Sequence, residues 1–560
     1  MKTGYPRFFI HKTISQFADD VAAEHGHAGQ KAMLFPTPKI ARRCFKFMHS
    51  MLKDDTLELE VLDLELATDK GTFPRWLTSL SPTISAVVCE KKHFPVAKQF
   101  WQHTGEGVSS RRAEYYHGLY KEGLLRRRGQ APRDQLSSTR SPPRGPRRYQ
   151  RPSSVALPTG PNTNHVRIHS PPSGDDESKD SFRFLEERFG RNLDLSQVAR
   201  AKSAIRKRIA GAMTANVMGD QPSRNSSIES NSRGISNLDE GDVYLYPCGM
   251  NAIFHVHQAL LSARGERKSI NFGFPYVDTL KILEKFGPGC VFYGRASSAD
   301  LDDLEERLSK GERFLALFCE FPGNPLLTCP DLKRIRQLSE AFDFAVVVDE
   351  TIGTFANINV LEFADVVVSS LTKIFSGSCN VMGGGAILNP NRPHYRAIKE
   401  ALERDFEDTY WPEDAVFMES NSRDFDARVD KVNTNAEVIC EVLVQDARVK
   451  RVYYPKYNES RPNYDMCRRP NGGYGGLLSV VFNKPKDAMA FFDALDTAKG
   501  PSLGTNFTLT CPYILLAHYQ EQEWAAAYGA DPSLIRVSVG LERPDELKVR
   551  FSKALEAIPT

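Results

Sequence analysis

The sequence lacks the features of a membrane-bound or secreted protein. No apolar run reaches the roughly 18 residues that a membrane-spanning helix needs. Residues 1–17 contain neither a long apolar core nor a small-residue cleavage site, so a secretory signal is not expected. None of the ten cysteines forms a C-x-x-C pair, which argues against a zinc site and against a disulfide framework. We therefore expect a cytoplasmic protein with no membrane partner and no metal.

An excess of charge of one sign is also absent. The 73 basic and 70 acidic side chains give a formal net charge of +3, which provides no reason to expect a nucleic acid as the main partner. With 560 residues, the chain is long enough for roughly two to four domains of about 100–200 residues each. Hydrophobic residues make up 41% of it, enough to bury large cores.

One segment divides the chain. Residues 126–180 are polar and rich in Pro, Ser, Gly and Arg, and such a stretch cannot bury enough apolar surface to offset its chain entropy. We interpret it as a disordered basic linker. Its arginines are compatible with a solvated linker, with an anionic docking patch, or with a localisation signal that would allow nuclear presence.

The part before the linker, residues 1–125, is expected to form a small N-terminal extension domain. Residues 39–53 have the apolar spacing of a helix, and a strand is expected within 84–94. Five histidines lack acidic or cysteine partners at ligand spacing, so surface or structural roles are expected for them: His11, His25, His27, His49 and His93.

After the linker, helical segments alternate with short apolar strands. The segments 314–320, 345–350 and 364–370 are typical of buried parallel strands, and Pro330-Asp331 begins a helix that is expected to reach about Phe342. This alternation predicts a large α/β domain over 181–430, with helices on both faces of its sheet. In such sheets the ligand lies beyond the carboxyl ends of the strands.

A second, smaller α/β domain is expected over 431–560. Its predicted elements are helices within 435–447 and 487–498 and strands at 449–454 and 477–482.

The segment 366–377 contains the first candidate for chemistry, Lys373. A hydrophobic strand ends in Ser370, and Thr372 and Lys373 follow before a turn at Gly377. A lysine at a strand end can hold an aldehyde cofactor as a Schiff base, and the two hydroxyls can donate to a phosphate. A solvated surface lysine is the alternative that this segment alone leaves open.

Asp349 and the 249–250 segment add two further candidates. Asp349 ends an apolar strand, where a carboxylate could hold a pyridine nitrogen protonated, or could simply cap a helix. Gly249 and Met250 precede an amphipathic helix, and a glycine there lets backbone N–H groups approach a phosphate, although it is also an ordinary helix start.

Three side chains on other segments complete the candidate set. Tyr276 is an aromatic ring that could stack on a cofactor, and Asn324 lies in a Pro/Gly loop after a strand. Arg536 lies in a short strand near the C-terminus and could pair with a carboxylate. Each residue alone has an ordinary structural explanation, but all of them in this order point to one site.

In this order the motifs resemble the Cys/Met-metabolism enzymes of fold type I, which depend on pyridoxal 5′-phosphate (PLP), and specifically the fungal-type cystathionine γ-synthases. The resemblance covers roughly residues 182–555. The motifs are GM at 249–250, Y-x-x-T at 276–279, E-x-P-x-N-P at 320–325, V-D-x-T at 348–351, S-x-T-K at 370–373, SLGTNFTL at 502–509 and RVSVGLE at 536–542. It implies a PLP-dependent transferase with a mostly parallel seven-stranded sheet, a smaller C-terminal domain and an N-terminal extension.

The resemblance also implies a role for each site residue. Lys373 would hold PLP and act in catalysis together with Tyr276, which stacks on the ring, while Asp349 would bind the pyridine nitrogen. The phosphate would be held by Gly249, Met250, Ser370 and Thr372, and by Arg188 of a neighbouring subunit. Asn324 would lie near the ring hydroxyl. Arg536, with Ser502 and Asn324 close by, would bind the substrate carboxylate.

Some positions depart from the family pattern. Glu186 stands where the family has the tyrosine that accompanies Arg188, and Glu350 follows Asp349 where many relatives have asparagine or aspartate. Phe507 replaces the glutamate that reads the distal substrate amine, and Ser378-Cys379 replaces a more polar pair. These departures bear more on which nucleophile enters the reaction than on how the cofactor is bound.

The expected reaction is a γ-replacement on an O-acyl-L-homoserine, with acetate or succinate leaving and L-cysteine entering, in transsulfuration for methionine biosynthesis. The resemblance favours a homotetramer built as a dimer of dimers. The alternatives are a carbon nucleophile such as a β-keto acid in secondary metabolism, a cystathionine γ-lyase, and a non-catalytic regulator.

Overall fold

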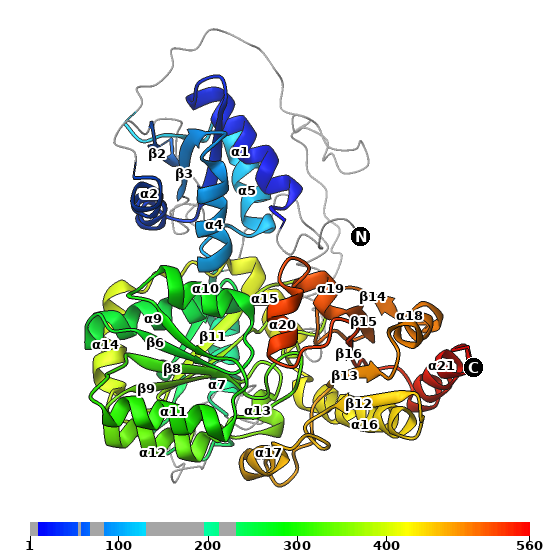
Figure 1. The fold of residues 1–560 in the computed structure, drawn as a ribbon. Coiled ribbons are helices and arrows are strands. Elements are labelled where there is room, and N and C mark those ends of the chain that lie inside the picture. Colours follow the sequence, from blue (N-terminus) through cyan, green and yellow to red (C-terminus); the bar gives the residue numbers. More distant parts are fainter. Residues whose placement is uncertain (1–8, 54–57, 68–82, 130–194, 212–230, 560) are drawn as a thin grey trace, which may run out of the picture.

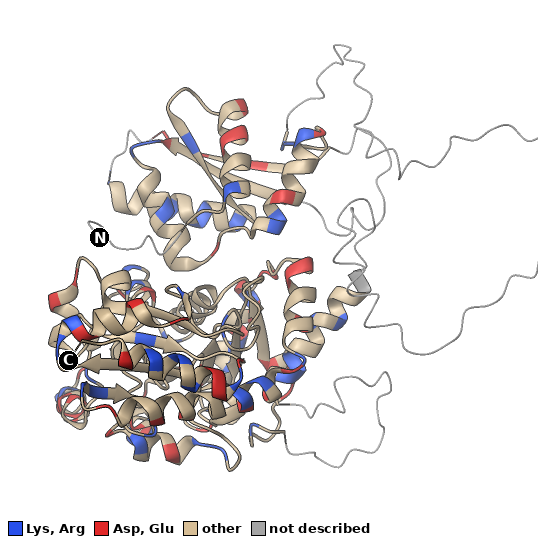
Figure 2. Ribbon diagram, turned by 90° about the vertical axis from the view of Figure 1, so that its right-hand side faces the viewer, with Lys and Arg blue, Asp and Glu red and all other residues tan. Residues whose placement is uncertain are grey.

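The computed structural model describes residues 9–53, 58–67, 83–129, 195–211 and 231–559, which form an N-terminal domain, a large domain and a C-terminal domain (Figure 1). Most of the expected linker, and Arg188 with it, lies outside the described residues. Lys, Arg, Asp and Glu are interspersed over the described domains (Figure 2), in keeping with the near-balance of charge in the sequence. Among the described helices, none is long and apolar enough to cross a membrane.

The N-terminal domain contains a four-stranded antiparallel sheet in the order β1-β3-β2-β4. Two apolar cores pack on it, one beneath α1 and α5 and the other beneath α2 and α4. Arg126 and Arg127 pair with β2, so the ordered domain continues past the boundary expected at 125. The elements are α1 (Lys12–His25), β1 (Gln30–Phe35), α2 (Pro38–Leu52), β2 (Glu60–Leu66), β3 (Thr83–Glu90), α4 (Phe94–Thr104), α5 (Ser110–Lys121) and β4 (Leu125–Arg127).

The large domain has a seven-stranded sheet in the order β5-β11-β10-β9-β8-β6-β7, in which only β11 runs antiparallel to its neighbours. This confirms the predicted mostly parallel sheet. Its strands are β5 (Val243–Tyr246), β6 (Ser269–Phe272), β7 (Cys290–Tyr293), β8 (Ala316–Glu320), β9 (Ala345–Asp349), β10 (Val366–Ser369) and β11 (Gly384–Leu388), and its helices include α7 (Leu195–Ile209), α9 (Gly249–Arg264), α10 (Val277–Lys285), α11 (Ser298–Ser309), α12 (Leu332–Phe342), α13 (Thr354–Asn357), α14 (Tyr395–Asp405) and α15 (Pro412–Asn421).

The central strands are apolar on both faces because helices cover both. In β9, Val346 and Val348 face a core shared with α11 and α12, whereas Ala345 and Val347 face a core shared with α9 and α14. All four side chains are fully buried. The strand therefore becomes polar only at its carboxyl end, at Asp349, where it leaves the two cores.

The C-terminal domain has a mostly antiparallel five-stranded sheet, in the order β12-β13-β16-β15-β14. The long helix α16 spans residue 430, so the expected domain boundary falls inside a helix rather than a loop. The elements are α16 (Phe425–Val444), β12 (Val449–Tyr453), α17 (Arg461–Cys467), β13 (Leu477–Phe482), α18 (Pro485–Ala494), β14 (Ala498–Lys499), β15 (Leu509–Pro512), α19 (Tyr513–Ala517), α20 (Gln522–Ala527), β16 (Ile535–Ser538) and α21 (Pro544–Glu556).

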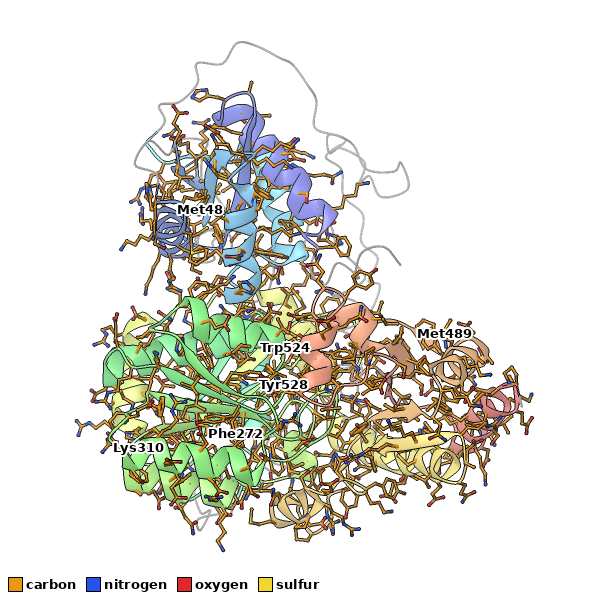
Figure 3. All side chains as sticks on the ribbon, viewed as in Figure 1. Met48, Phe272, Lys310, Met489, Trp524 and Tyr528 are labelled. Atoms are coloured by element: carbon orange, nitrogen blue, oxygen red, sulfur yellow. The ribbon has the colours of Figure 1, made fainter. Side chains whose placement is uncertain are left out.

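Aromatic rings fix the C-terminal domain against the large domain. The rings of Trp524 and Tyr528, which lie at and just beyond α20 (Figure 3), pack against Phe292 at centroid distances of 5.6 and 5.0 Å. Trp524 also contacts Phe274, at 5.2 Å. Because Phe274 lies two residues before Tyr276, this packing fixes the loop that carries Tyr276.

Candidate active site

A cavity of about 300 Å³ lies between the carboxyl ends of the large-domain strands and the C-terminal domain. It is the position that a doubly wound sheet predicts for a ligand. The candidates named from the sequence line it together, with the exception of Arg188: Gly249, Met250, Tyr276, Asn324, Asp349, Ser370, Thr372, Lys373, Ser502 and Arg536.

The beginning of helix α9 forms one wall of the cavity. Its N-cap residue, Cys248, makes no side-chain cap bond, so the first-turn N–H groups have no such partner. Gly249 is needed there because a Cβ atom on it would lie 2.8 Å from the Cβ of Ser370. The close approach places a helix N-terminus beside a hydroxyl, which is the geometry of an anion site.

Two threonines fix the backbone around this wall. The hydroxyl of Thr351 accepts the Ser370 N–H at 2.8 Å. The N–H of Thr351 donates in turn to Asp349 Oδ1, also at 2.8 Å. The Thr372 hydroxyl makes two hydrogen bonds to Gly383. It donates to the Gly383 carbonyl at 3.3 Å and accepts the Gly383 N–H at 3.1 Å. Thr351 thus connects the strand ends of Asp349 and Ser370.

Lys373 extends into the cavity from the loop after β10. Its Nζ donates to Ser502 Oγ at 3.1 Å, and its backbone N–H donates to the Ser370 carbonyl at 3.2 Å. The turn that follows needs Gly377, which has a φ of +69°. Lys373 is the only lysine among the described residues that line the cavity.

Two carboxyl groups at neighbouring strand ends face the same cavity. Burial raises the pKa of Asp349 to about 6, with a smaller contribution from the charge of Glu350. Burial, together with the charge of Asp349, raises the pKa of Glu320 to about 8. Glu320 accepts the backbone N–H of Tyr276, and that of Asn324 at 3.1 Å. Glu320 therefore fixes both the loop that carries Tyr276 and the loop that carries Asn324.

These raised pKa values predict how stability depends on pH. Because both pKa values are higher in the folded chain, protonation of Asp349 and Glu320 favours folding. This contribution to the unfolding free energy is complete below the unfolded pKa values of about 3.8 and 4.5. It is lost as the pH rises through the folded pKa values of about 6 and about 8. At about 1.4 kcal/mol per pKa unit, the cofactor-free protein should lose up to about 5 kcal/mol of unfolding free energy from these groups between about pH 5 and about pH 8, most of it from Glu320.

Urea unfolding at the two pH values checks this expectation. The matched control is the double variant Asp349→Asn, Glu320→Gln, which keeps the side-chain shapes but removes both titrations. We expect a smaller decrease in its unfolding free energy, and an equal decrease in the two proteins would contradict the assignment.

Arg536 forms the opposite wall and is 2% exposed. One guanidinium nitrogen donates to Asn324 Oδ1 at 2.9 Å, and another donates to the Ser502 carbonyl at 2.8 Å and to the Pro501 carbonyl. Its guanidinium carbon lies 4.2 Å from the ring centroid of Tyr513. The Tyr513 hydroxyl accepts from Asn324 Nδ2 at 2.8 Å. Arg536 is thus held in place with its charge facing the cavity.

Tyr513 and Thr351 are polar residues of the cavity lining that sequence reasoning did not name as candidates. Tyr513 lies in an apolar segment, TCPYILLA, that has the composition of an ordinary core element. Its contact with Asn324 joins residues 189 positions apart, which no local pattern encodes. Thr351 belongs to the V-D-x-T motif, so its position in that motif was the available signal.

The departure at Glu350 has a structural explanation. Glu350 points away from the cavity and forms a bidentate ion pair with Arg233, at 2.6 and 2.8 Å, and both side chains are at most 2% exposed. Arg233 also donates to the Ile209 carbonyl at 3.0 Å. This pair attaches the segment before β5 to the loop that follows Asp349. Among the described residues, no group of three or more His, Cys, Asp or Glu side chains could hold a metal.

Two families match the chain. The family described as "Cys/Met metabolism PLP-dependent enzyme" matches residues 223–556. The family described as "Fungal trans-sulfuration enzyme, N-terminal domain" matches residues 13–109. The two matches lie on the two sides of residues 130–194 and account for the catalytic part and the N-terminal domain separately.

Individual relatives extend over nearly the whole chain. A cystathionine gamma-synthase of Neurospora crassa is 59% identical, over 99% of this chain and 92% of its own length. A cystathionine gamma-synthase-like enzyme of Amanita muscaria is 38% identical, over 99% and 90%. The crystal structure of cystathionine gamma synthase from Xanthomonas oryzae pv. oryzae, in complex with aminoacrylate and cysteine, aligns with a TM-score of 0.51 at 25% identity, covering 64% of this chain and 98% of that one.

Proposed function

The chain belongs to the Cys/Met metabolism PLP-dependent enzymes, and on that premise we propose that it is a cystathionine γ-synthase. It replaces the γ-acyloxy group of an O-acyl-L-homoserine with the thiol of L-cysteine. The observation that carries the proposal is the 59% identity, over 99% of the chain, to the Neurospora crassa cystathionine gamma-synthase. The grouping of the motif residues around one cavity supports it.

The residues of the cavity fit PLP. The α9 N-terminus beside Ser370 provides N–H groups and a hydroxyl for a phosphate, and only glycine allows their close approach. Asp349 is a half-buried carboxyl whose pKa is raised by burial, and a protonated pyridine nitrogen would be a suitable partner for its charge. Lys373 is an amine in the same cavity. The cavity volume of about 300 Å³ is at the lower end of the usual range for small-molecule sites.

PLP, when bound, supplies an electron sink for negative charge that develops on the substrate carbons. Asp349 would keep that sink effective by holding the ring nitrogen protonated. Lys373 Nζ would remove the α-proton of the substrate and move a proton to the β-carbon. Ser502 Oγ, which now accepts from Nζ at 3.1 Å, would orient the amine for these transfers.

Arg536 would bind the α-carboxylate of the substrate. Its charge already faces the cavity, and Asn324 and the carbonyl oxygens of Pro501 and Ser502 hold its orientation. With the substrate fixed at this end, the Cγ–O bond breaks and the acyl group leaves as a carboxylate with the bonding pair. The cysteine sulfur then forms the Cγ–S bond, and the thiol proton would pass to Lys373 Nζ or to the Tyr276 hydroxyl, two groups of the same cavity.

A carbon nucleophile is the second candidate, because Ser378 and Cys379 depart from the family pattern at positions that bear on the incoming nucleophile. A product assay distinguishes the two. Purified protein is incubated with O-acetyl- or O-succinyl-L-homoserine and with L-cysteine or a β-keto acid, and the products are identified by mass. We expect cystathionine, formed at least about tenfold faster than the carbon adduct. A carbon adduct formed faster than cystathionine would contradict the proposal, as would cleavage of added cystathionine as the main activity.

We further propose a cytoplasmic homo-oligomer, built as a dimer of dimers. All ten cysteines are unpaired, which suits a reducing compartment. Met382 lines the cavity yet is 53% exposed, and Phe507 is 46% exposed. The resemblance to the fungal-type enzymes supports this assembly, in which a second subunit would cover such side chains.

A further inference from the structure

Five consecutive residues of the N-terminal domain contact the large domain beside the cavity. They are Gln102 to Glu106, at and just after the end of helix α4, and we call them the docking segment. Figure 1 shows the lower end of α4 directly above α10. The contacts reach only two elements of the large domain, α9 and α10, which are the helices that begin at Gly249 and immediately after Tyr276.

The first set of contacts is to the beginning of α9. Asn251 Nδ2 donates to the Thr104 carbonyl at 3.0 Å, and both side chains are at most 2% exposed. Cys248 Sγ lies 3.7 Å from the Gly105 carbonyl. Gly105 has a φ of +65°, and a Cβ atom on it would lie 2.5 Å from Cys248 Sγ and 2.9 Å from the Asn251 nitrogen. Only glycine therefore lets the docking segment lie against the two residues that flank Gly249 and Met250.

The second set of contacts is to the beginning of α10. His103 Nδ1 lies 2.9 Å from Asp278 Oδ1, and Gln102 Nε2 donates to the same oxygen at 3.3 Å. His103 is 6% exposed, and Asp278 is fully buried. Asp278 is two residues beyond Tyr276, so this contact holds the helix start from which Tyr276 extends into the cavity.

A third contact joins the segment to the second turn of α9. The carboxylate of Glu106 is 1% exposed and lies 3.2 Å from His255 Nε2. It also forms an ion pair with Arg43 of helix α2. The docking segment is thus fixed within its own domain as well as against the large domain.

Neither helix start is capped by its own side chain. Cys248 and Tyr276 occupy the N-cap positions of α9 and α10, and neither makes a side-chain cap bond. Capping side chains normally fix the first turn of a helix by about 0.5–2 kcal/mol. The docking segment contributes contacts to both first turns, alongside the Glu320 carboxylate that accepts the Tyr276 N–H.

We infer that the docking segment is a positioning element for the cofactor site, and that the N-terminal domain thereby sets the affinity for PLP. This rests on the proposed function, because it requires that Gly249, Met250 and Tyr276 contact the cofactor. If the segment is displaced, the beginnings of α9 and α10 become free to move. These are the parts of the chain that would contact the phosphate and the ring of PLP. PLP affinity decreases as a result, although no residue of the segment lines the cavity.

The test uses the full chain with two substitutions in the N-terminal domain. Gly105→Ala drives a Cβ atom into Cys248 and Asn251. His103→Ala removes the shorter of the two contacts that the segment makes to Asp278 and leaves the one from Gln102. We expect each to weaken PLP binding at least about tenfold, measured by titrating cofactor-free protein with PLP. Amide exchange should become faster in residues 248–252 and 276–280.

The matched control is Lys39→Met. Lys39 makes another contact between the same two domains, to Asp405 at 3.2 Å, remote from the beginnings of α9 and α10. We expect wild-type PLP affinity and wild-type exchange in both segments. His103→Gln keeps a donor for Asp278 and should recover most of the affinity, which a purely local packing role would not predict.

Three outcomes separate the possibilities. If Gly105→Ala and His103→Ala lower the thermal midpoint but bind PLP as the wild type does, the segment is only a stabilising contact and the inference is overturned. If Gly105→Ala does not fold, His103→Ala and His103→Gln decide by the same titration. If the wild-type protein itself binds no PLP and forms no cystathionine, the proposed function has failed rather than this inference alone.

Discussion

Replacing Lys373 with alanine is expected to decrease kcat by at least about 10⁴-fold. The substitution removes both the covalent attachment of PLP and the base at the α-carbon. Lys373 is the only lysine among the described residues lining the cavity, so no second amine can replace it. The purified variant should also lose the visible absorbance of the bound cofactor. Steady-state cystathionine formation and the absorbance spectrum measure the two effects separately.

The control is Lys373→Arg, which keeps a positive charge near Ser502 but has no nucleophilic amine. It should be as inactive as the alanine variant while retaining more PLP, held without the covalent bond. Turnover within tenfold of the wild type in either variant would contradict the role proposed for Lys373.

Replacing Arg536 with leucine is expected to lower kcat/KM for the homoserine ester by about 10²–10³-fold. The loss of one partner of a buried charge pair typically costs about 2–5 kcal/mol, and each 1.36 kcal/mol is a factor of ten. The visible spectrum should change little, because the guanidinium contacts Asn324, Tyr513 and backbone carbonyls rather than Lys373. Steady-state kinetics at varied homoserine ester concentration measure the effect.

Two variants make this prediction specific. Arg536→Lys keeps the charge but loses the fork of donors, and should fall between the wild type and the leucine variant. Arg451→Leu removes an arginine of the same domain that does not line the cavity, and should keep wild-type kcat/KM. A loss in the Arg451 variant as large as that in the Arg536 variant would mean that the effect is structural.

The sequence predicted the fold well because the large domain is built from strands buried on both faces. Such strands are continuous apolar runs, and the strands predicted at 345–350 and 364–370 contain β9 (Ala345–Asp349) and β10 (Val366–Ser369). Their carboxyl ends are marked by polar residues, Asp349 in β9 and Ser369-Ser370 at the end of β10, which is how Asp349 and Ser370 could be singled out. The membership of the PLP-dependent family, read from the motif order, is confirmed.

The contacts between distant segments could not be read in the same way. Tyr513 reaches Asn324 across the domain boundary, and Gly105 lies against Cys248 across more than a hundred residues. Neither Tyr513 nor Gly105 belongs to a pattern with catalytic spacing. Their importance comes from tertiary packing, which the local spacing of residues does not encode. The roles given to the individual site residues remain predictions, and the role of Arg188 concerns a residue outside the described part of the chain.

The most direct test of the central claim is to locate the cofactor on the chain. The purified protein is saturated with PLP, reduced with borohydride to make the attachment permanent, and digested for peptide mass analysis. We predict one phosphopyridoxyl group per chain, on the peptide that contains Lys373, and none in the Lys373→Ala variant. Attachment mainly at another lysine, or no attachment to a protein that still forms cystathionine, would contradict the account.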